Sequence, residues 1–282
     1  MPGLLAVFPS PPSNVVSLGP LSLHLYGAML AVGVVVAAWI AERRWVAKGH
    51  PRKDLSDILV WVVIAGVIAA RLYHVATDYQ LYTHDPLKAL EIWKGGLAIW
   101  GAVGGGGLAV VLLARRRHLD LGDLADSIAP ALLVAQAIGR WGNWFNQELF
   151  GGPTNLPWAL RIDPARRPRG YAQYATFHPT FLYESLYCLL VFAILLVIER
   201  RYRLAKGQVF ALYAALYTAG RFVWEEMRID PAHTIGPLRV NAWVSLVVFT
   251  SAWVLYFWLG HRKTPAAPPV DSRQPAPSQT GS

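Results

Sequence analysis

Seven apolar segments, each about twenty residues long, constrain the fold of this 282-residue chain most strongly. A helix of about this length crosses the roughly 30 Å hydrocarbon core of a bilayer. Only 15% of the residues are charged, whereas soluble domains carry about 25%. The sequence therefore predicts an all-α polytopic membrane protein. Its seven transmembrane helices are expected near residues 22–41, 56–76, 96–114, 122–142, 179–199, 207–224 and 240–260.

Lys and Arg residues are concentrated in alternate loops, which predicts an orientation. The connections after the first, third and fifth apolar segments, together with the C-terminal tail, hold 15 of the 26 basic residues. Short cytoplasmic loops collect Lys and Arg, so we expect the N-terminus outside and the C-terminus in the cytoplasm. Because this placement accounts for most of the net charge of +9, no nucleic-acid partner is needed to explain it.

One membrane domain is sufficient for residues 1–262. Residues 1–13 lack a basic start and contain prolines, so they fit a short external segment better than a signal peptide. Residues 143–178 form the longest connection and are expected to fold back on the outer membrane surface. Residues 263–282 are rich in Pro, Ala and Ser, which predicts a disordered cytoplasmic tail. The run GAVGGGG at 101–107 lacks the GK[ST] ending of a phosphate loop and is interpreted as a close contact between helices.

Charged residues at the ends of apolar segments are the main functional candidates, because a charge in a bilayer is costly and marks function by default. Arg71, Arg140, Glu184 and Arg221 all fall near the expected outer ends of their segments. If they share one cavity, two or more arginines there form an anion site. A phosphate is the most plausible anion, because guanidinium groups match its geometry.

Several of these residues also have a purely structural interpretation. Arg71 could reach the membrane interface or bond a neighbouring helix end. Arg221 and Glu225 lie four residues apart and could form only an internal ion pair. Asp126 could cap its own helix or the preceding one. Cys188, the only cysteine, lies in an apolar run and is assigned no chemistry.

Residues 139–152, GRWGNWFNQELFGG, combine polar groups with glycines at the end of an apolar segment. Arg140, Asn143, Asn146 and Glu148 supply a guanidinium group, two amides and a carboxylate. A loop facing lipid does not tolerate so many polar groups unless they line a wet cavity. The motif therefore predicts a polar site at the membrane surface.

This motif also carries a specific family resemblance. GRWGNWFNQELFG at 139–151 resembles the signature of prolipoprotein diacylglyceryl transferases, which are multi-pass enzymes of the bacterial plasma (inner) membrane. The resemblance covers most of residues 20–260. Four further stretches agree with the family in order and placement: LHLYG at 23–27, KGGLAIWGAVGG at 94–105, HPTFLYE at 178–184 and GRFVWEEMR at 220–228.

The resemblance implies the first step of bacterial lipoprotein maturation. The enzyme would transfer the diacylglyceryl group of phosphatidylglycerol to the thiol of the lipobox cysteine in a prolipoprotein signal peptide. A thioether would form and glycerol 1-phosphate would leave. The expected partners are therefore phosphatidylglycerol, the signal peptide and membrane lipid, with no cofactor and no metal.

The resemblance also implies site residues. Arg140, Arg221, Glu225 and Tyr26 would be catalytic, with the two arginines holding the phosphate and headgroup. The expected substrate-binding residues are Arg140, Asn143, Asn146, Glu148, Gly151, Arg228, His178 and Arg71.

Trp100 departs from the family pattern, because many members have a histidine there that is proposed as the base for the thiol. Indole has no basic nitrogen. Either the histidine is not essential, or Glu225, Tyr26 or His178 replaces it, with His24 a weaker candidate. A thiol beside two arginines could also ionise without a dedicated base. Phe181 likewise stands where a polar residue is common, which removes a hydrogen-bonding group.

The competing hypothesis is a polytopic transporter or an anionic-lipid-binding membrane protein that uses the same arginines without breaking a bond. An inverted internal repeat is typical of many transporters, and none is recognisable in the sequence.

Overall fold

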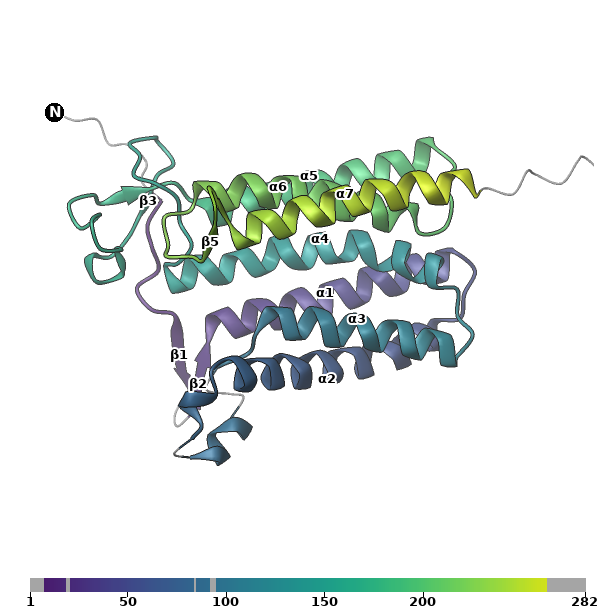
Figure 1. Cartoon of the computed structure of the whole chain (residues 1–282), viewed down its shortest axis with the longest axis horizontal. Coiled ribbons are helices and arrows are strands. Elements are labelled where there is room, and N and C mark those ends of the chain that lie inside the picture. Colours follow the sequence, from purple (N-terminus) through teal and green to yellow (C-terminus); the bar gives the residue numbers. More distant parts are fainter. Residues whose placement is uncertain (1–7, 19–20, 84, 92–94, 263–282) are drawn as a thin grey trace, which may run out of the picture.

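The computed structural model describes residues 8–18, 21–83, 85–91 and 95–262. This part of the chain is mostly helical, and seven long helices run back and forth beside one another (Figure 1). The seven helices are α1 (Leu25–Ala47), α2 (Arg52–Thr77), α3 (Ile99–Arg116), α4 (Leu121–Asn146), α5 (Thr180–Arg201), α6 (Gln208–Met227) and α7 (Val240–His261). The predicted number of helices is confirmed for the described residues.

Six of these helices are long and apolar enough to cross a membrane, and α6 is the exception. The α6 helix begins with Gln208 and carries Arg221 and Glu225 in its second half, which lowers its mean hydropathy. Its apolar face is nevertheless buried, because Val209, Leu212 and Tyr213 belong to a core shared with α4 and α5. The segment expected to span the membrane at 207–224 is thus a helix whose apolar face is buried against α4 and α5.

The α4 helix lies at the centre of the bundle. Half of its most apolar window is buried, the largest share among the six membrane-type helices. It packs between α1 on one side and α5 and α6 on the other (Figure 1). Small residues permit this contact, because a Cβ atom on Gly142 would lie 2.7 Å from the Tyr26 ring of α1. The position of α4 brings its polar C-terminal turn close to both halves of the bundle.

The glycine-rich run of α3 lies against α2, as the sequence predicts. A Cβ atom on Gly101 would overlap the backbone oxygen of Ala69, and one on Gly105 would overlap the Ala69 side chain. Gly104 and Gly107 have no atom within 4 Å of such a position. Gly101 and Gly105, about one helical turn apart, therefore serve the α2–α3 contact, which supports the interpretation of this run as a packing motif.

The two ends of the bundle differ. At one end lie the α1–α2, α3–α4 and α5–α6 connections, which hold the clustered Lys and Arg residues; we call this the basic end. The other end, called here the sheet end, carries three two-stranded antiparallel sheets (Figure 1). These pair β1 (Val15–Leu18) with β2 (Leu21–His24), β3 (Leu160–Arg161) with β4 (Thr176–Phe177), and β5 (Thr234–Ile235) with β6 (Leu238–Arg239). The sheet end also holds the short 3-10 helices η1 (Tyr79–Leu81), η2 (Pro86–Leu90) and η4 (Pro164–Arg166).

The long connection between α4 and α5 packs on the sheet end of the bundle. Phe150, Leu160 and Phe177 are buried with Phe181 of α5 in an aromatic and aliphatic cluster. The N-terminal Phe8 joins this cluster, because its N–H donates to the Ala159 carbonyl at 2.8 Å. Phe181 therefore fills an apolar role here, which accounts for the absence of a polar residue at this position.

The end of α4 differs from the expectation. The sequence predicts that the helix ends near residue 142, but it continues to Asn146. Gln147 then adopts a left-handed conformation with φ of 52° and ends the helix. Because the last turn is helical, Arg140 and Asn143 lie one turn apart on one face. The predicted cytoplasmic tail at 263–282 and residues 1–7 of the predicted external segment lie outside the described residues.

Candidate active site

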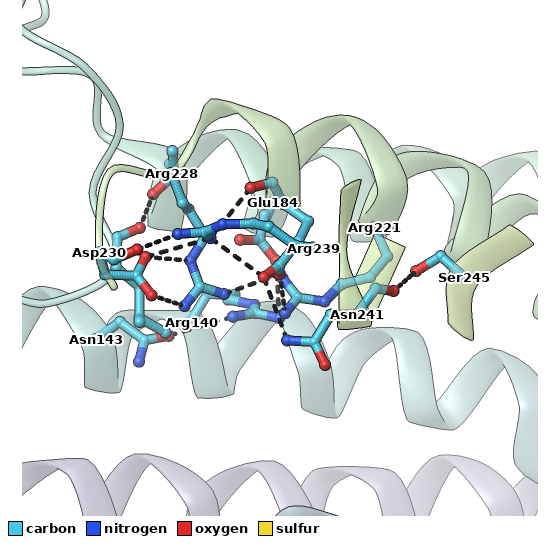
Figure 2. Close-up of polar contacts among 12 residues, drawn as sticks. Arg140, Asn143, Glu184, Arg221, Arg228, Asp230, Arg239, Asn241 and Ser245 are labelled. Carbon is cyan, nitrogen blue, oxygen red and sulfur yellow. Dashed lines mark hydrogen bonds and ion pairs between the residues drawn. The ribbon is translucent and has the colours of Figure 1, made fainter. Parts of the chain in front are cut away.

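Four helix ends meet at the sheet end and bring charged side chains together (Figure 2). Arg140 of α4 pairs with Glu184 of α5, with 2.7 Å between Nη2 and Oε2. Arg221 of α6 lies 3.7 Å from the same Glu184 oxygen. The Glu184 carboxylate is buried, so it stands between two guanidinium groups with little access to water. Of the four charged residues expected near the outer helix ends, Arg140, Glu184 and Arg221 converge here and Arg71 does not.

A second carboxylate, Glu225, continues the chain of ion pairs. Its Oε2 lies 2.6 Å from Nη2 of Arg221 and 3.1 Å from Nη1 of Arg228. Its Oε1 accepts hydrogen bonds from Arg239 and from Asn241, both at 3.2 Å. The Arg221–Glu225 ion pair suggested by their spacing therefore exists, but as part of a larger network.

Asp230, in the connection between α6 and α7, completes the network. Arg228 holds its carboxylate with two parallel hydrogen bonds of 2.8 and 2.9 Å. Burial alone would raise the pKa of Asp230, but the hydrogen bonds and charge of Arg228, with the charge of Arg239, hold it below its ordinary value. We refer to Arg140, Arg221, Arg228, Arg239, Glu184, Glu225 and Asp230 as the arginine cluster.

The arginine cluster contains four guanidinium groups and three carboxylates. The Nη1 atom of Arg221 is buried and has no hydrogen-bond partner among the described residues. A buried donor without a partner is costly, and a formal positive excess favours an anion. The arrangement can therefore bind an anionic group at the face where Arg221 and Arg140 both approach Glu184.

The amides of the α4 motif extend the site from Arg140. The Asn143 Oδ1 atom lies 3.4 Å from Nη1 of Arg140 and accepts its hydrogen bond. The Glu148 carboxylate accepts from Asn143 at 2.9 Å and from Asn146 at 3.2 Å. Arg140, Asn143, Asn146 and Glu148 thus form one connected group.

Gly151 lies where three segments pass close together. Its N–H donates to the His178 carbonyl at 3.0 Å, and its backbone pairs with that of Arg228. A Cβ atom there would lie 2.9 Å from the His178 side chain and 3.2 Å from the Met227 carbonyl. Any side chain at this position would push Arg228 or His178 away, so the glycine is required by close approach.

A cavity of about 240 Å³ opens beside the arginine cluster. Asn146, Glu148 and Asp230 line it from the side of the cluster. Arg166 and Pro168 line it from the long α4–α5 connection. The cavity thus gives the polar residues around the cluster an opening at the sheet end.

Two charged residues singled out in the sequence lie elsewhere in the fold. Arg71 donates to the carbonyls of Lys88, Ala89, Gly95 and Gly96 at 2.6 to 2.8 Å, so it fastens the α2–α3 connection. Asp126 accepts from the backbone N–H groups of Gly207 and Phe210 at 2.8 and 3.0 Å. It therefore caps α6, and the expectation that it caps its own or the preceding helix is wrong.

Comparison with known proteins identifies the family. The profile described as "Prolipoprotein diacylglyceryl transferase" matches residues 13–258. The chain belongs to the prolipoprotein diacylglyceryl transferase family. The resemblance found in the sequence is thereby confirmed, and with it the class of a multi-pass bacterial membrane transferase.

Three curated relatives illustrate the similarity, and each is named a phosphatidylglycerol-prolipoprotein diacylglyceryl transferase. The protein of Cutibacterium acnes is 50% identical over 257 residues, which are 90% of this chain and 87% of the relative. The second such protein of Streptomyces coelicolor is 47% identical over 92% of this chain and 82% of its own length. That of Corynebacterium glutamicum is 46% identical over 93% and 87%. These names favour the enzyme over the competing transporter hypothesis.

In this diacylglyceryl transferase the candidates for the thiol's base are spread over the sheet end. Trp100 lies in the first turn of α3 and is about half exposed. His178 shares a hydrogen bond of 3.2 Å with the Tyr183 hydroxyl. The Tyr26 ring packs on Gly142, and its hydroxyl interacts electrostatically with Glu148 and Arg140. His24 lies exposed at the N-terminal end of α1, as expected for a polar helix-end residue.

Three members of this transferase's site escape the sequence reasoning: Asp230, Arg239 and Asn241. They follow α6 or begin α7, outside the motif that ends at Arg228. The available signal was a charged residue directly before an apolar segment, at the same end as Arg140 and Arg221. Arg239 has this placement, immediately before the first residue of α7.

Proposed function

We propose that this protein transfers the diacylglyceryl group of phosphatidylglycerol to the lipobox cysteine of a prolipoprotein, with the arginine cluster as its phosphate site. The observation that carries this proposal is the buried Nη1 of Arg221, which makes no hydrogen bond within the described residues and lies 3.7 Å from the Glu184 oxygen that Arg140 also contacts. A phosphate oxygen is the acceptor that such a donor requires. Family membership supplies the two substrates.

The reaction exchanges one bond for another. The thiol sulfur attacks C3 of the diacylglyceryl group, a C–S bond forms, and the C–O bond to the phosphate breaks. Glycerol 1-phosphate leaves with the electron pair of that bond, and the thiol proton is released. Negative charge grows on the phosphate as the C–O bond breaks. Preorganised guanidinium groups therefore stabilise the transition state more strongly than they stabilise the ground state with lipid bound.

Arg140 and Arg221 are assigned the leaving phosphate, because both approach Glu184 from different helices. This shared carboxylate fixes their relative position while neutralising part of their charge. Asn143, Asn146 and Glu148 shape the adjoining wall through their hydrogen bonds. Arg228 and Gly151 hold the segment after α6 against the segment before α5, where His178 lies.

Arg71 and Tyr26 are assigned supporting roles. Arg71 uses its donors on four backbone carbonyls, so it would influence the substrate by ordering the α2–α3 connection. Tyr26 contributes the α1 side of the site next to Gly142. The thiol proton passes to Tyr26 or His178, or directly to water. Direct loss to water needs no dedicated base, because two neighbouring arginines favour the thiolate electrostatically.

The sheet end is assigned to the outer membrane surface and the basic end to the cytoplasm, with residues 1–262 as one membrane domain. The clustered Lys and Arg residues of the α1–α2, α3–α4 and α5–α6 connections support this orientation. A site at the outer surface would admit phosphatidylglycerol from the membrane and release glycerol phosphate into water through the cavity beside Glu148 and Asp230.

Purified protein in phosphatidylglycerol vesicles, mixed with a synthetic lipobox peptide, tests the proposal. We expect the peptide mass to rise by one diacylglyceryl group, with one glycerol phosphate released per peptide modified. Vesicles of phosphatidylethanolamine and a peptide with serine in place of the cysteine are the controls. An unchanged cysteine peptide with phosphatidylglycerol present would overturn the proposed function.

A further inference from the structure

Glu225 is the most enclosed carboxylate of the arginine cluster, with a side chain that is 0% exposed. Its two oxygens receive four donors from three parts of the chain. Arg221 and Arg228 occupy Oε2, while Arg239 and Asn241 occupy Oε1. Figure 2 shows these side chains converging on one point between α6 and the start of α7.

This arrangement uses the whole acceptor capacity of Glu225. An ionised carboxylate offers about four lone-pair sites, and four donors lie within 3.2 Å of them. No site remains to take a proton from a thiol. Glu225 therefore acts by holding cations in place and is not the base of the reaction.

Arg239 is the donor that anchors Glu225 from outside α6. Its Nη1 also donates to the Glu225 carbonyl at 3.2 Å, and its Nη2 donates to the Asp230 carbonyl. The Glu225 carbonyl belongs to the last turn of α6, where carbonyls lack helical partners. One guanidinium group thus joins the end of α6, the following loop and the start of α7.

We propose that Arg239 is a positioning residue of the transferase, which acts through Glu225 on Arg221. The inference rests on the proposed function. With Arg239 in place, Glu225 is fixed from its Oε1 side and holds Nη2 of Arg221 at 2.6 Å. Nη1 of Arg221, which lies 3.7 Å from Glu184 Oε2 and makes no hydrogen bond within the described residues, is then held in place to donate to the phosphate. Within the described part of the chain, the hydrogen bonds and ion pairs of Arg239 go to Glu225 and Asp230, and none goes to Arg140 or Glu184.

Loss of Arg239 should affect the reaction step more than lipid binding. Arg140 and Arg228 would still attract phosphatidylglycerol, so its KM should change little. Arg221 would lose its fixed orientation, so the growing charge on the leaving phosphate would be less stabilised. Removing the partner that orients a metal ligand typically costs roughly 10- to 100-fold in activity, and we expect a loss of the same order in kcat here.

The test compares Arg239→Met, Arg239→Lys and the control Arg169→Met, each in the full chain in phosphatidylglycerol vesicles. Arg169 is exposed at the same end of the bundle and lies outside the arginine cluster. We expect a 10- to 100-fold lower kcat for Arg239→Met with KM for phosphatidylglycerol within about threefold. Arg239→Lys should recover part of kcat, because an ammonium group keeps the charge but lacks the planar fork.

A parallel test uses Glu225→Gln, with the neighbouring exposed Glu226→Gln as control. We expect Glu225→Gln to lower kcat without changing the shape of the pH profile. The inference is wrong if Arg239→Met keeps the wild-type kcat, or if it raises KM alone. It is also wrong if Glu225→Gln removes an ionisation from the pH profile. Wild-type and Arg169→Met activity in the same assay separates these outcomes from failure of the proposed function, in which no variant would transfer the lipid.

Discussion

Arg140 and Glu184 form an ion pair of 2.7 Å that joins α4 to α5 at the sheet end of the bundle. The Glu184 side chain is 4% exposed, so this pair is largely removed from water. Breaking a buried pair by removing one partner is costly, because the other charge is left uncompensated. Arg140 therefore carries two separable roles, one in stability and one in the chemistry at the phosphate.

These two roles predict different results for single and double variants. Arg140→Met should unfold at a lower temperature than the wild type and should lose transferase activity. Arg140→Met combined with Glu184→Gln should regain much of the thermal stability. The buried Glu184 carboxylate, left with only its 3.7 Å contact to Arg221 among the described residues in the single variant, is then no longer charged, and Arg221 keeps its 2.6 Å pair with Glu225. The kcat of the double variant should stay about 100-fold or more below that of the wild type. Recovery of both stability and activity in the double variant would show that Arg140 has no part in the reaction.

Asp230 predicts a pH-dependent difference in stability. The folded-state pKa of Asp230 is below its ordinary value, chiefly because Arg228 hydrogen-bonds the carboxylate against the opposing effect of burial. The contribution of Asp230 to folding stability is therefore fully present when the pH is above the unfolded-state pKa of about 3.9. It is lost as the pH falls through the lower pKa of the folded state. Asp230→Asn should thus be less stable than the wild type at pH 7. The gap between their thermal unfolding temperatures should narrow below about pH 4, and a constant gap would contradict the linkage.

Trp100 predicts a change in rate without a change in proton chemistry. Its indole lies about half exposed in the first turn of α3 and has no basic nitrogen. Trp100→Ala should lower activity by a few-fold through lost packing or lipid contact, while the pH dependence of kcat keeps its shape. Ile99→Ala, at an exposed neighbouring position, is the control. A shifted apparent pKa in the Trp100 variant alone would show that this position takes part in proton transfer.

The proposed orientation predicts which ends of the helices are accessible from outside the cell. The natural Cys188 is buried, so an added cysteine can be labelled against a low background. Arg169→Cys, at the sheet end, should react with a membrane-impermeant thiol reagent in intact cells. Arg116→Cys, at the basic end, should react only after the membrane is opened. The reverse pattern would invert the assigned topology.

The fold was accessible from the sequence because helix length and apolarity are local properties. Seven segments of about the right length alternate in direction, so residues at alternate ends must gather at one surface. This predicts that Arg71, Arg140, Glu184 and Arg221 lie at the same end of the bundle, but it does not predict that only the last three share one site. The glycines at 101 and 105 could be interpreted in the same way, because small residues in an apolar helix have few uses besides close packing.

The partner of each polar side chain was less accessible. Asp126 caps α6, more than 80 residues later in the chain. Arg71 could bond to the membrane interface, to a helix end or to a ligand, and only the folded α2–α3 connection decides among these. Arg239 was missed because its partner Glu225 looked satisfied by Arg221 within one helix. Such pairings depend on side-chain geometry between distant segments, which apolar patterns do not encode.

The single-turnover rate of Arg221→Lys in phosphatidylglycerol vesicles tests the central claim most directly, because this rate isolates bond breaking from substrate binding. If Nη1 of Arg221, which makes no hydrogen bond within the described residues, stabilises the departing phosphate, the rate constant should fall by about 100-fold or more. Thioether formation and glycerol phosphate release should be reduced together. Saturating phosphatidylglycerol should not restore it. A rate constant equal to that of the wild type at saturating lipid would contradict the assignment of the arginine cluster as the catalytic phosphate site.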